Sequence, residues 1–291
     1  MRNRGLKKLT AFDIFIFVFL SLYALIIFYP FYNAILTSLV SVGTYTRTPA
    51  MLIPPEIIFD NFQYLLSGPL IWSGYVSTLI IVASGTVYGM TISLMMAYAF
   101  SRQHFPGKKI IFKLMLFTLF FSGGLLPLYL LIRNLNLIDS RLAIILMFGM
   151  SPFFVIIMKT TFEQIPASIE EAAKIDGAND LTIFWSIMLP LQKPVIATFS
   201  LFTAVNYWNE WFWSMLIIQS REKMTLQLVL RLIINEAAAD IETLSAMTAQ
   251  AVFAQGVRMA AVVVTMLPIM LVYPFLQKYF VKGVMIGAIK M

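Results

Sequence analysis

The chain has 291 residues, of which 60% are hydrophobic and only 12% are charged. A soluble domain of this size carries about 25% charged residues, so the composition excludes a soluble globular protein and indicates an integral membrane protein. The net charge of +7 does not indicate a nucleic-acid partner, because membrane proteins collect Lys and Arg in their cytoplasmic loops. There are no cysteines, and the one histidine, His104, lies in a short polar loop, so we expect no disulfide, no metal site and no catalytic group.

Six long apolar segments predict an all-α membrane protein with six transmembrane helices in one domain, because about twenty apolar residues are needed to cross a bilayer as a helix. The first segment follows a basic N-terminus and is longer than the apolar core of a signal peptide, so we interpret it as a retained span. The expected spans cover about 11–34, 71–100, 110–133, 141–162, 194–218 and 256–279.

The distribution of Lys and Arg predicts which side of the membrane each connecting segment faces. Fourteen of the 21 basic residues lie in the N-terminus, in 101–113, in 159–193 and in the C-terminal tail, and the remaining seven lie in the opposite segments. By the positive-inside rule, both termini and the loop 163–193 are expected in the cytoplasm. The loop 219–255 is then expected outside, and its helix-compatible runs predict that it is structured.

Glycine and proline interrupt three of the expected spans. The interruptions fall at Ser122 to Pro127, at Gly149 to Pro152, and at Pro268 and Pro274. Backbone groups freed inside a bilayer must find partners in neighbouring protein or in a water-filled cavity, which favours a transport path over a plain anchor. Glycine and proline are also commoner in membrane helices in general, and this accounts for part of the pattern.

The most polar part of the loop 163–193 runs from Glu170 to Pro190 and predicts a helical hairpin. Pro166 suits the first turn of a helix, Glu170 can pair with Lys174 four residues later, and Gly177 can end the helix. A second short helix is expected to start at Asn179 or Asp180 and to end before Pro190.

The charges of this hairpin favour a protein partner over a lipid surface. A helix that lies on lipid is normally rich in Lys and Arg and carries a bulky apolar face, whereas Glu170 to Asp180 holds four acids and one lysine. Ala172 and Ala173 leave the helix slim enough to enter a groove, and Glu171 and Asp176 can pair with polar groups of the partner. We therefore interpret the hairpin as a docking element.

These residues resemble the EAA loop of the permease subunits of ATP-binding-cassette (ABC) importers. The matching positions are Glu171, Ala172, Ala173, Asp176, Gly177, Ala178, Ile187, Leu189 and Pro190. Ala97 to Arg102 and Trp208 to Glu210 are similar to the carbohydrate branch of these permeases, and Gly123 to Pro127 resembles the maltose-type subgroup that serves complex oligosaccharides. The resemblance covers nearly the whole chain.

The resemblance implies a type I ABC importer permease fold in the cell membrane, with the EAA hairpin as the helix that couples transport to ATP hydrolysis. The implied partners are a second related permease, two ABC ATPase subunits that bind ATP and Mg²⁺, and an extracytoplasmic solute-binding protein. The chain lacks a GxxxxGK[ST] loop, so we expect it to be no enzyme and to bind no cofactor itself. The implied coupling residues are Glu170, Glu171, Ala172, Ala173, Asp176, Gly177 and Ala178.

Polar and aromatic residues gather in the fifth expected span and form a candidate substrate path. The cluster comprises Asn206, Tyr207, Trp208, Asn209, Glu210 and Trp213, and we add Gly123 and Gly124 from the third span. In one continuous helix, Asn206 and Glu210 would share a face, and polar groups at such depth are costly unless they face protein or water. The alternative is an outer aromatic belt with hydrogen bonds between helices.

The expected substrate is an oligosaccharide, with an acidic (uronate) saccharide or a small polyol as alternatives. Glu210 suits a neutral sugar, whereas an acidic one would need a compensating cation such as Arg133, Arg141 or Arg258. A secondary transporter driven by an ion gradient would show mid-bilayer charges and two repeated halves, and neither is clear in this sequence. A membrane sensor or assembly factor would explain the hairpin but not the interrupted spans.

Overall fold

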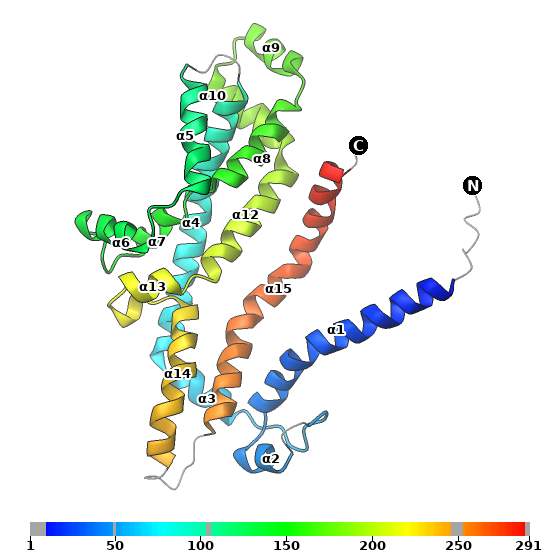
Figure 1. Cartoon of the computed structure of the whole chain (residues 1–291), viewed down its shortest axis with the longest axis vertical. Helices are drawn as coiled ribbons and strands as arrows, with labels where there is room; N and C mark the ends of the chain where they lie inside the picture. Colours follow the sequence, from blue (N-terminus) through cyan, green and yellow to red (C-terminus); the bar gives the residue numbers. More distant parts are fainter. Residues whose placement is uncertain (1–9, 49–50, 103–105, 246–252, 289–291) are drawn as a thin grey trace. The chain divides into compact units, whose positions relative to one another are not determined.

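The computed structural model describes the backbone of residues 10–48, 51–102, 106–245 and 253–288, and the side chains of these ranges except in 236–245 and 273–288. His104 lies outside the described residues. The regular elements within these ranges are helices, so the predicted all-α class is confirmed (Figure 1). Contacts divide the chain into two compact units, Met1–Gly68 with Leu232–Met266, and Pro69–Arg231 with Leu267–Met291.

The first unit begins with helix α1 (Ala11–Ser38), which is followed by α2 (Val42–Arg47) and α3 (Asp60–Ser67). A capping box starts α1, since Thr10 Oγ1 accepts a hydrogen bond from the Asp13 N–H at 3.3 Å and the Asp13 carboxylate accepts one from the Thr10 N–H at 2.9 Å. Most apolar side chains of α1 are exposed in the isolated chain, which suits a helix surrounded by lipid or by a partner.

The second unit is built along helix α4 (Pro69–Ser101), which packs against α12 (Lys193–Trp208) and α8 (Pro152–Glu163). Close contact requires glycine on α4: a Cβ at Gly89 would lie 2.6 Å from the carbonyl oxygen of Gly149. Gly149 lies in the break between α7 and α8, and this backbone can approach α4 so closely only because residue 89 lacks a side chain. At this point α4 therefore packs directly against backbone atoms and not only against apolar side chains.

The third and fourth expected spans are divided at the predicted glycines and prolines. Helices α5 (Lys108–Phe120) and α6 (Leu125–Asn134) are bent by 118° at a break, where Gly124 adopts a φ of +85°. Helices α7 (Arg141–Met147) and α8 are bent by 51°. The predicted interruptions at these two sites are confirmed.

The fifth and sixth expected spans differ from the prediction. Helix α15 (Ala254–Ala288) continues through Pro268 and Pro274, so the sixth expected span is not divided, because a proline removes one hydrogen bond without ending a well-supported helix. The fifth expected span is divided instead: α12 ends at Trp208, and α13 (Phe212–Ile217) begins after a break of three residues.

Three helices in the described ranges are long and apolar enough to cross a membrane, and up to six spans result if each bent helix pair counts as one. The loop 219–255 contains the 3₁₀ turn η2 (Arg221–Lys223) and helix α14 (Leu226–Ser245), so the prediction of a structured loop is confirmed. The single membrane domain with six spans stays a prediction.

Candidate functional site

The predicted hairpin is present as helix α9 (Ala167–Ile175), a glycine turn and a second helical segment. Gly177 has a φ of +83°, and two backbone hydrogen bonds close the turn, from Ala178 N–H to Ala173 C=O at 2.9 Å and from Gly177 N–H to Lys174 C=O at 3.1 Å. This pair of bonds is a Schellman motif, which requires a left-handed residue at the position of Gly177. The predicted stop at this glycine is confirmed.

The second segment starts at the predicted residue but ends later than expected. Asn179 Oδ1 accepts a hydrogen bond from the Thr182 N–H at 2.8 Å and begins α10 (Asp180–Thr182). A π-helical stretch (Ile183–Met188, η1) then leads into α11 (Leu189–Leu191), so the prediction that the helix ends before Pro190 is wrong. The wider π turn tolerates the missing proline N–H, and an 85° bend follows before α12.

A buried carboxylate connects α9 to the end of α4. Glu170 is only 8% exposed and forms ion pairs with Arg102 of the segment after α4 and with Lys174, the latter at 3.0 Å. The predicted pairing of Glu170 with Lys174 is confirmed. The Arg102 guanidinium lies 4.7 Å from the centre of the Tyr98 ring, which holds it over the helix end.

Apolar packing supports this ionic connection. Ala173 of α9 is buried in a core cluster with Phe184 of η1, Tyr98 of α4 and Phe162 of α8. The Tyr98 ring lies 5.1 Å from the Phe184 ring and 5.8 Å from the Phe162 ring. The hairpin is therefore seated on the ends of two helices and is not a free loop.

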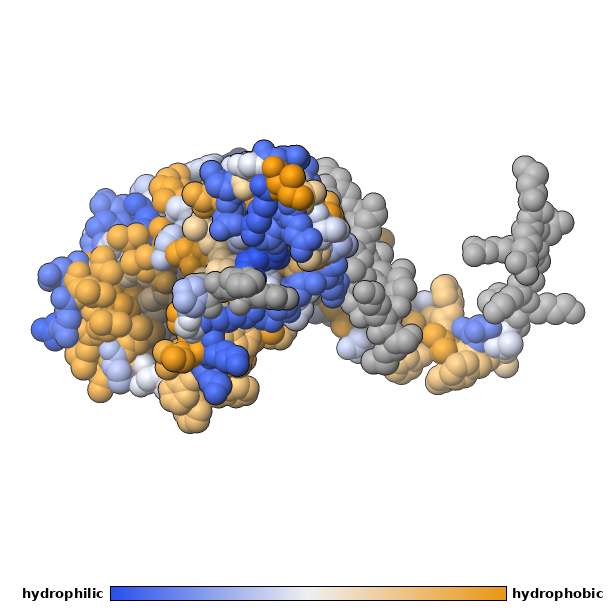
Figure 2. Space-filling model, turned by 90° about the horizontal axis from the view of Figure 1, so that it is seen from above, coloured by the Kyte–Doolittle hydropathy of each residue, from blue (hydrophilic) through white to orange (hydrophobic). Residues whose placement is uncertain are grey.

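The opposite face of the hairpin is exposed and combines acidic and apolar groups. Glu171, Ala172 and Asp176 are exposed, and so are several large apolar side chains, of which Ile175 is 86% exposed. Figure 2 shows the end of the second unit that carries α9, where hydrophilic side chains surround a few hydrophobic ones. The large exposed apolar side chains from α9 to α11 are Ile169, Ile175, Leu181, Trp185 and Leu191.

The two alanines of the EAA motif face opposite ways. Ala172 lies on the exposed face, whereas Ala173 is buried against the chain itself. The expectation that both alanines keep the partner-facing surface slim is wrong for Ala173, because successive residues of a helix point about 100° apart. Ala173 instead allows α9 to approach α4 and α8 closely.

The residues of the candidate substrate path are divided between packing and surface positions. Tyr207 is buried, its hydroxyl donates to the Ile145 carbonyl at 2.7 Å, and its ring fills the space left by Gly85. Trp208 is also buried, whereas Asn206 and Asn209 are exposed. Tyr207 therefore contributes to the core between α4, α7 and α12.

Glu210 does not share a helix face with Asn206, because α12 ends at Trp208. Glu210 is 9% exposed, and its Oε1 accepts a hydrogen bond from the Trp213 N–H at 2.5 Å at the start of α13. The predicted common face is wrong, and the reason is that this carboxylate satisfies the N-terminal N–H groups of a new helix.

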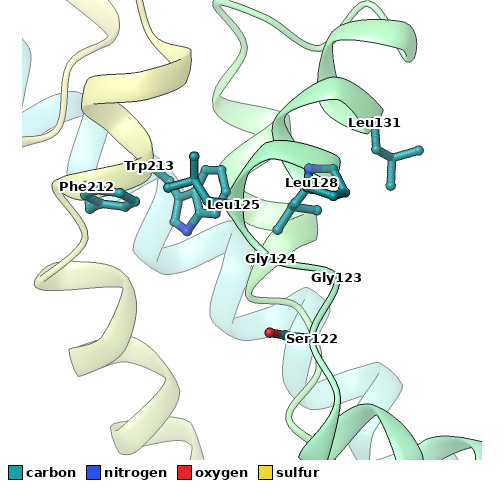
Figure 3. A pocket seen from close by; sticks show the side chains of 9 residues that line it. Ser122, Gly123, Gly124, Leu125, Leu128, Leu131, Phe212 and Trp213 are labelled. Atoms are coloured by element: carbon teal, nitrogen blue, oxygen red, sulfur yellow. The ribbon is translucent and has the colours of Figure 1, made fainter.

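A cavity of about 550 Å³ brings Gly123, Gly124 and Trp213 together. Figure 3 shows Trp213 of α13 beside Leu125 of α6, with the two glycines in the segment that precedes α6. The lining is almost entirely apolar, and Ser122 supplies its one side-chain hydroxyl. Such a lining offers few hydrogen bonds to a sugar. The lining residues are Ser122, Gly123, Gly124, Leu125, Pro127, Leu128, Leu131, Phe212 and Trp213.

Sequence reasoning assigned no role to several groups that the tertiary structure uses. Arg102 belongs to the pattern shared with the family, and its pairing with Glu170 joins α9 to the end of α4. Asp139 and Lys223 form an ion pair at 2.6 Å between distant loops, and Arg231 lies over the Trp211 ring at 3.8 Å. No rule of residue spacing along the sequence predicts these pairs, since their members are 20 or more residues apart.

No group of three or more His, Cys, Asp or Glu side chains that could hold a metal ion occurs in the parts of the chain that the structure describes.

The fold and the seated hairpin define an integral membrane permease, and the chain belongs to the family described as "Binding-protein-dependent transport system inner membrane component", whose model matches residues 9–286. It is therefore a multi-pass transport subunit of the cell membrane and not an enzyme, and the predicted family is confirmed. The family implies separate ATPases and a solute-binding protein as partners.

Individual relatives are similar over the full length. The chain is 39% identical to the polygalacturonan/rhamnogalacturonan transport system permease protein YtcP of Bacillus subtilis (strain 168), over 100% of both chains. It is 37% identical to Protein LplC of the same organism, over 96% of this chain and 95% of the relative. A solved structure of a bacterial ABC transporter involved in the import of the acidic polysaccharide alginate has a chain that matches with a TM-score of 0.87 and 34% identity, over 92% of this chain and 96% of that one.

Proposed function

We propose that this chain is one transmembrane subunit of an ATP-driven, binding-protein-dependent importer of oligosaccharides. It pairs with a second, related permease, two ABC ATPases bind on the cytoplasmic side, and an extracytoplasmic binding protein delivers the sugar. ATP and Mg²⁺ belong to the ATPases. The saccharide cargo is supported by the relatives, which include a polygalacturonan/rhamnogalacturonan permease and an alginate importer.

The observation that carries this proposal is the two-sided construction of α9. One side, with Glu170 and Ala173, is buried and tied to the ends of α4 and α8, and the other side presents Glu171, Ala172 and Asp176. A helix held in this way transmits force, because a partner that moves its exposed face must move the helices to which its buried face is fixed. The movement that follows is a rigid-body alternation between inward-open and outward-open states.

Contacts within this chain support a role for helix α4 in passing on the movement of α9. Helix α4 contacts α8, α7 and α12, so a displacement at its end is shared among the elements packed on it. The coupling residues on the exposed face are then Glu171, Ala172, Asp176 and Gly177, while Glu170, Ala173 and Ala178 hold the hairpin in place.

The substitution Glu171→Lys tests this coupling. We expect uptake and sugar-stimulated ATP hydrolysis to fall to background in the assembled importer, because the substitution reverses a charge on the docking face without touching the buried side. Membrane insertion of the chain should be unchanged. The measurement is oligosaccharide uptake and ATP hydrolysis in proteoliposomes that contain all subunits.

Glu163→Lys is a matched control at the end of α8. Glu163 is exposed and pairs with Lys159 at 2.7 Å, an i,i+4 surface pair worth about 0.5 kcal/mol. This variant has the same change of charge outside the hairpin, and we expect it to transport normally. Normal transport by the Glu171→Lys variant would refute the coupling role of α9.

A further inference from the structure

Arg231, which is exposed, stacks on the half-buried ring of Trp211, and the coupling mechanism does not use this pair. The guanidinium carbon of Arg231, on α14, lies 3.8 Å from the centre of the Trp211 ring, in the break between α12 and α13. Arg231 is exposed, and among the described residues no carboxylate forms an ion pair with it. Stacking on an aromatic ring fixes the plane of the guanidinium and leaves its N–H edges directed outward.

Two other cations of the same unit, Arg141 and Lys223, are engaged in contacts within the chain. Arg141 donates from Nε to the Ser77 hydroxyl at 2.9 Å and from Nη2 to the Glu222 carbonyl at 2.8 Å. Lys223 donates to the Asp139 carboxylate at 2.6 Å. Arg141, which the sequence offered as a cation for an acidic sugar, therefore has a structural role.

Glu210, the acid that favours a neutral sugar over an acidic one, is used as a hydrogen-bond acceptor at the start of α13. Glu210 lies next to Trp211 in the chain but is 9% exposed, and its carboxylate accepts the Trp213 N–H at the start of α13. Its negative charge is stabilised by the N-terminus of that helix. Two polar groups remain exposed: the amide of Asn209 in the break between α12 and α13, and the guanidinium of Arg231 on α14.

We infer that Arg231, held on Trp211, is a subsite for the carboxylate of an acidic saccharide such as a uronate oligomer. A planar guanidinium matches a carboxylate with two parallel N–H···O bonds. The amide of Asn209, which is exposed and stands two residues before Trp211 in the chain, suits sugar hydroxyls. This inference rests on the proposed importer function and narrows its substrate class. Arg231 selects by charge and geometry, so it determines specificity.

The test compares an acidic and a neutral oligosaccharide in the complete importer. Trigalacturonate and galactotriose are supplied with the binding protein to proteoliposomes, and initial uptake rates are measured over a range of concentrations. For Arg231→Gln we expect uptake efficiency for trigalacturonate to fall about tenfold, the size of a lost charge-assisted hydrogen-bonded pair, with galactotriose unaffected. For Arg231→Lys, uptake efficiency for trigalacturonate should lie between that of the wild type and that of Arg231→Gln, because a lysine keeps the charge but not the planar fork.

Arg221→Gln is the matched control, because Arg221 is an exposed arginine of the same unit that contacts no aromatic ring in the described structure. It should transport both sugars as the wild type does. Equal loss of both sugars in the Arg231→Gln and Arg231→Lys variants, or no loss of either, would overturn the subsite. A wild-type importer that moves only galactotriose would overturn the subsite and leave the importer function standing, whereas one that moves neither sugar would refute both.

Discussion

At the scale of single residues, Asp139 joins two loops that are about 80 residues apart. It adopts a φ of +57°, and its carboxylate accepts hydrogen bonds from the Ser220 N–H at 2.9 Å and from the Lys223 ammonium at 2.6 Å. Its own N–H donates to the Ile217 carbonyl at 2.9 Å. One side chain thus connects the loop before α7 to the turn that follows α13.

The substitution Asp139→Asn should destabilise the protein by about 1–2 kcal/mol, because it removes a charge-assisted pair that is partly shielded from solvent. Asparagine tolerates the left-handed backbone conformation, so the loss reports on the charge and not on backbone strain. The measurement is thermal unfolding of the purified protein in detergent. Glu222→Gln, at an exposed carboxylate in the same turn, should change stability far less.

The pH dependence of this difference has a defined sign. The Lys223 ammonium and the Ser220 hydroxyl hold the pKa of the Asp139 carboxyl well below its usual range. A carboxyl whose pKa is lowered in the folded state stabilises the fold fully above its unfolded pKa of about 3.9, and this stabilisation is lost as the pH falls further. The melting-temperature difference between wild type and Asp139→Asn should therefore be constant from pH 7 to pH 5 and shrink below about pH 4. A difference that grows on acidification would contradict the assignment.

At the scale of elements, the contacts of α9 with the ends of α4 and α8 decide which face of the hairpin is exposed. The Schellman turn at Gly177 ends the helix, while the ion pair of Glu170 with Arg102 and the burial of Ala173 fix its orientation. A helix of nine residues is marginal in water by itself, so this packing supplies most of its stability.

A double-mutant cycle on Arg102 and Glu170 measures the ionic part of the seat. We expect Arg102→Ala and Glu170→Ala each to destabilise the protein, and the double variant to lose less than the sum, with a coupling energy of about 1–3 kcal/mol. The reason is that each single change leaves a buried or stacked charge without its partner. Equilibrium unfolding in detergent gives the four free energies. Strictly additive losses would show that the pair does not anchor α9.

At the scale of the whole molecule, the side of the membrane that the hairpin faces decides which partner it meets. The 14 to 7 distribution of basic residues predicts that α9 lies in the cytoplasm and that the turn at Arg221 lies outside. Since the chain has no cysteine, single introduced cysteines report their own exposure without background.

We expect Arg221→Cys to react with a membrane-impermeant maleimide on right-side-out vesicles, and Ile175→Cys to react only after the membrane is permeabilised. Both positions are exposed in the isolated chain, so a difference reflects the membrane and not burial. Addition of the ATPase subunits to permeabilised vesicles should protect Ile175→Cys. Labelling of Ile175→Cys from outside would reverse the topology and exclude cytoplasmic coupling.

Local patterns of the sequence determined the membrane class, the positions of the breaks at Gly124 and before Pro152, and the glycine stop of the hairpin. These features depend on composition, backbone conformation and short-range hydrogen bonds, which residues within one turn decide. The family resemblance rested on the same local motifs. The cytoplasmic side of the hairpin stays a prediction from the count of Lys and Arg in the loops.

Only the tertiary structure decided which groups face each other. It placed Ala173 inward and Ala172 outward, ended α12 before Glu210, carried α15 through Pro268, and paired Glu170 with Arg102 from 68 residues away. The physical reason is that packing between distant elements sets burial, and burial decides whether a charge caps a helix, anchors it or remains free. Arg231 remains available to a ligand for this reason, since no acid from another element reaches it in the described structure.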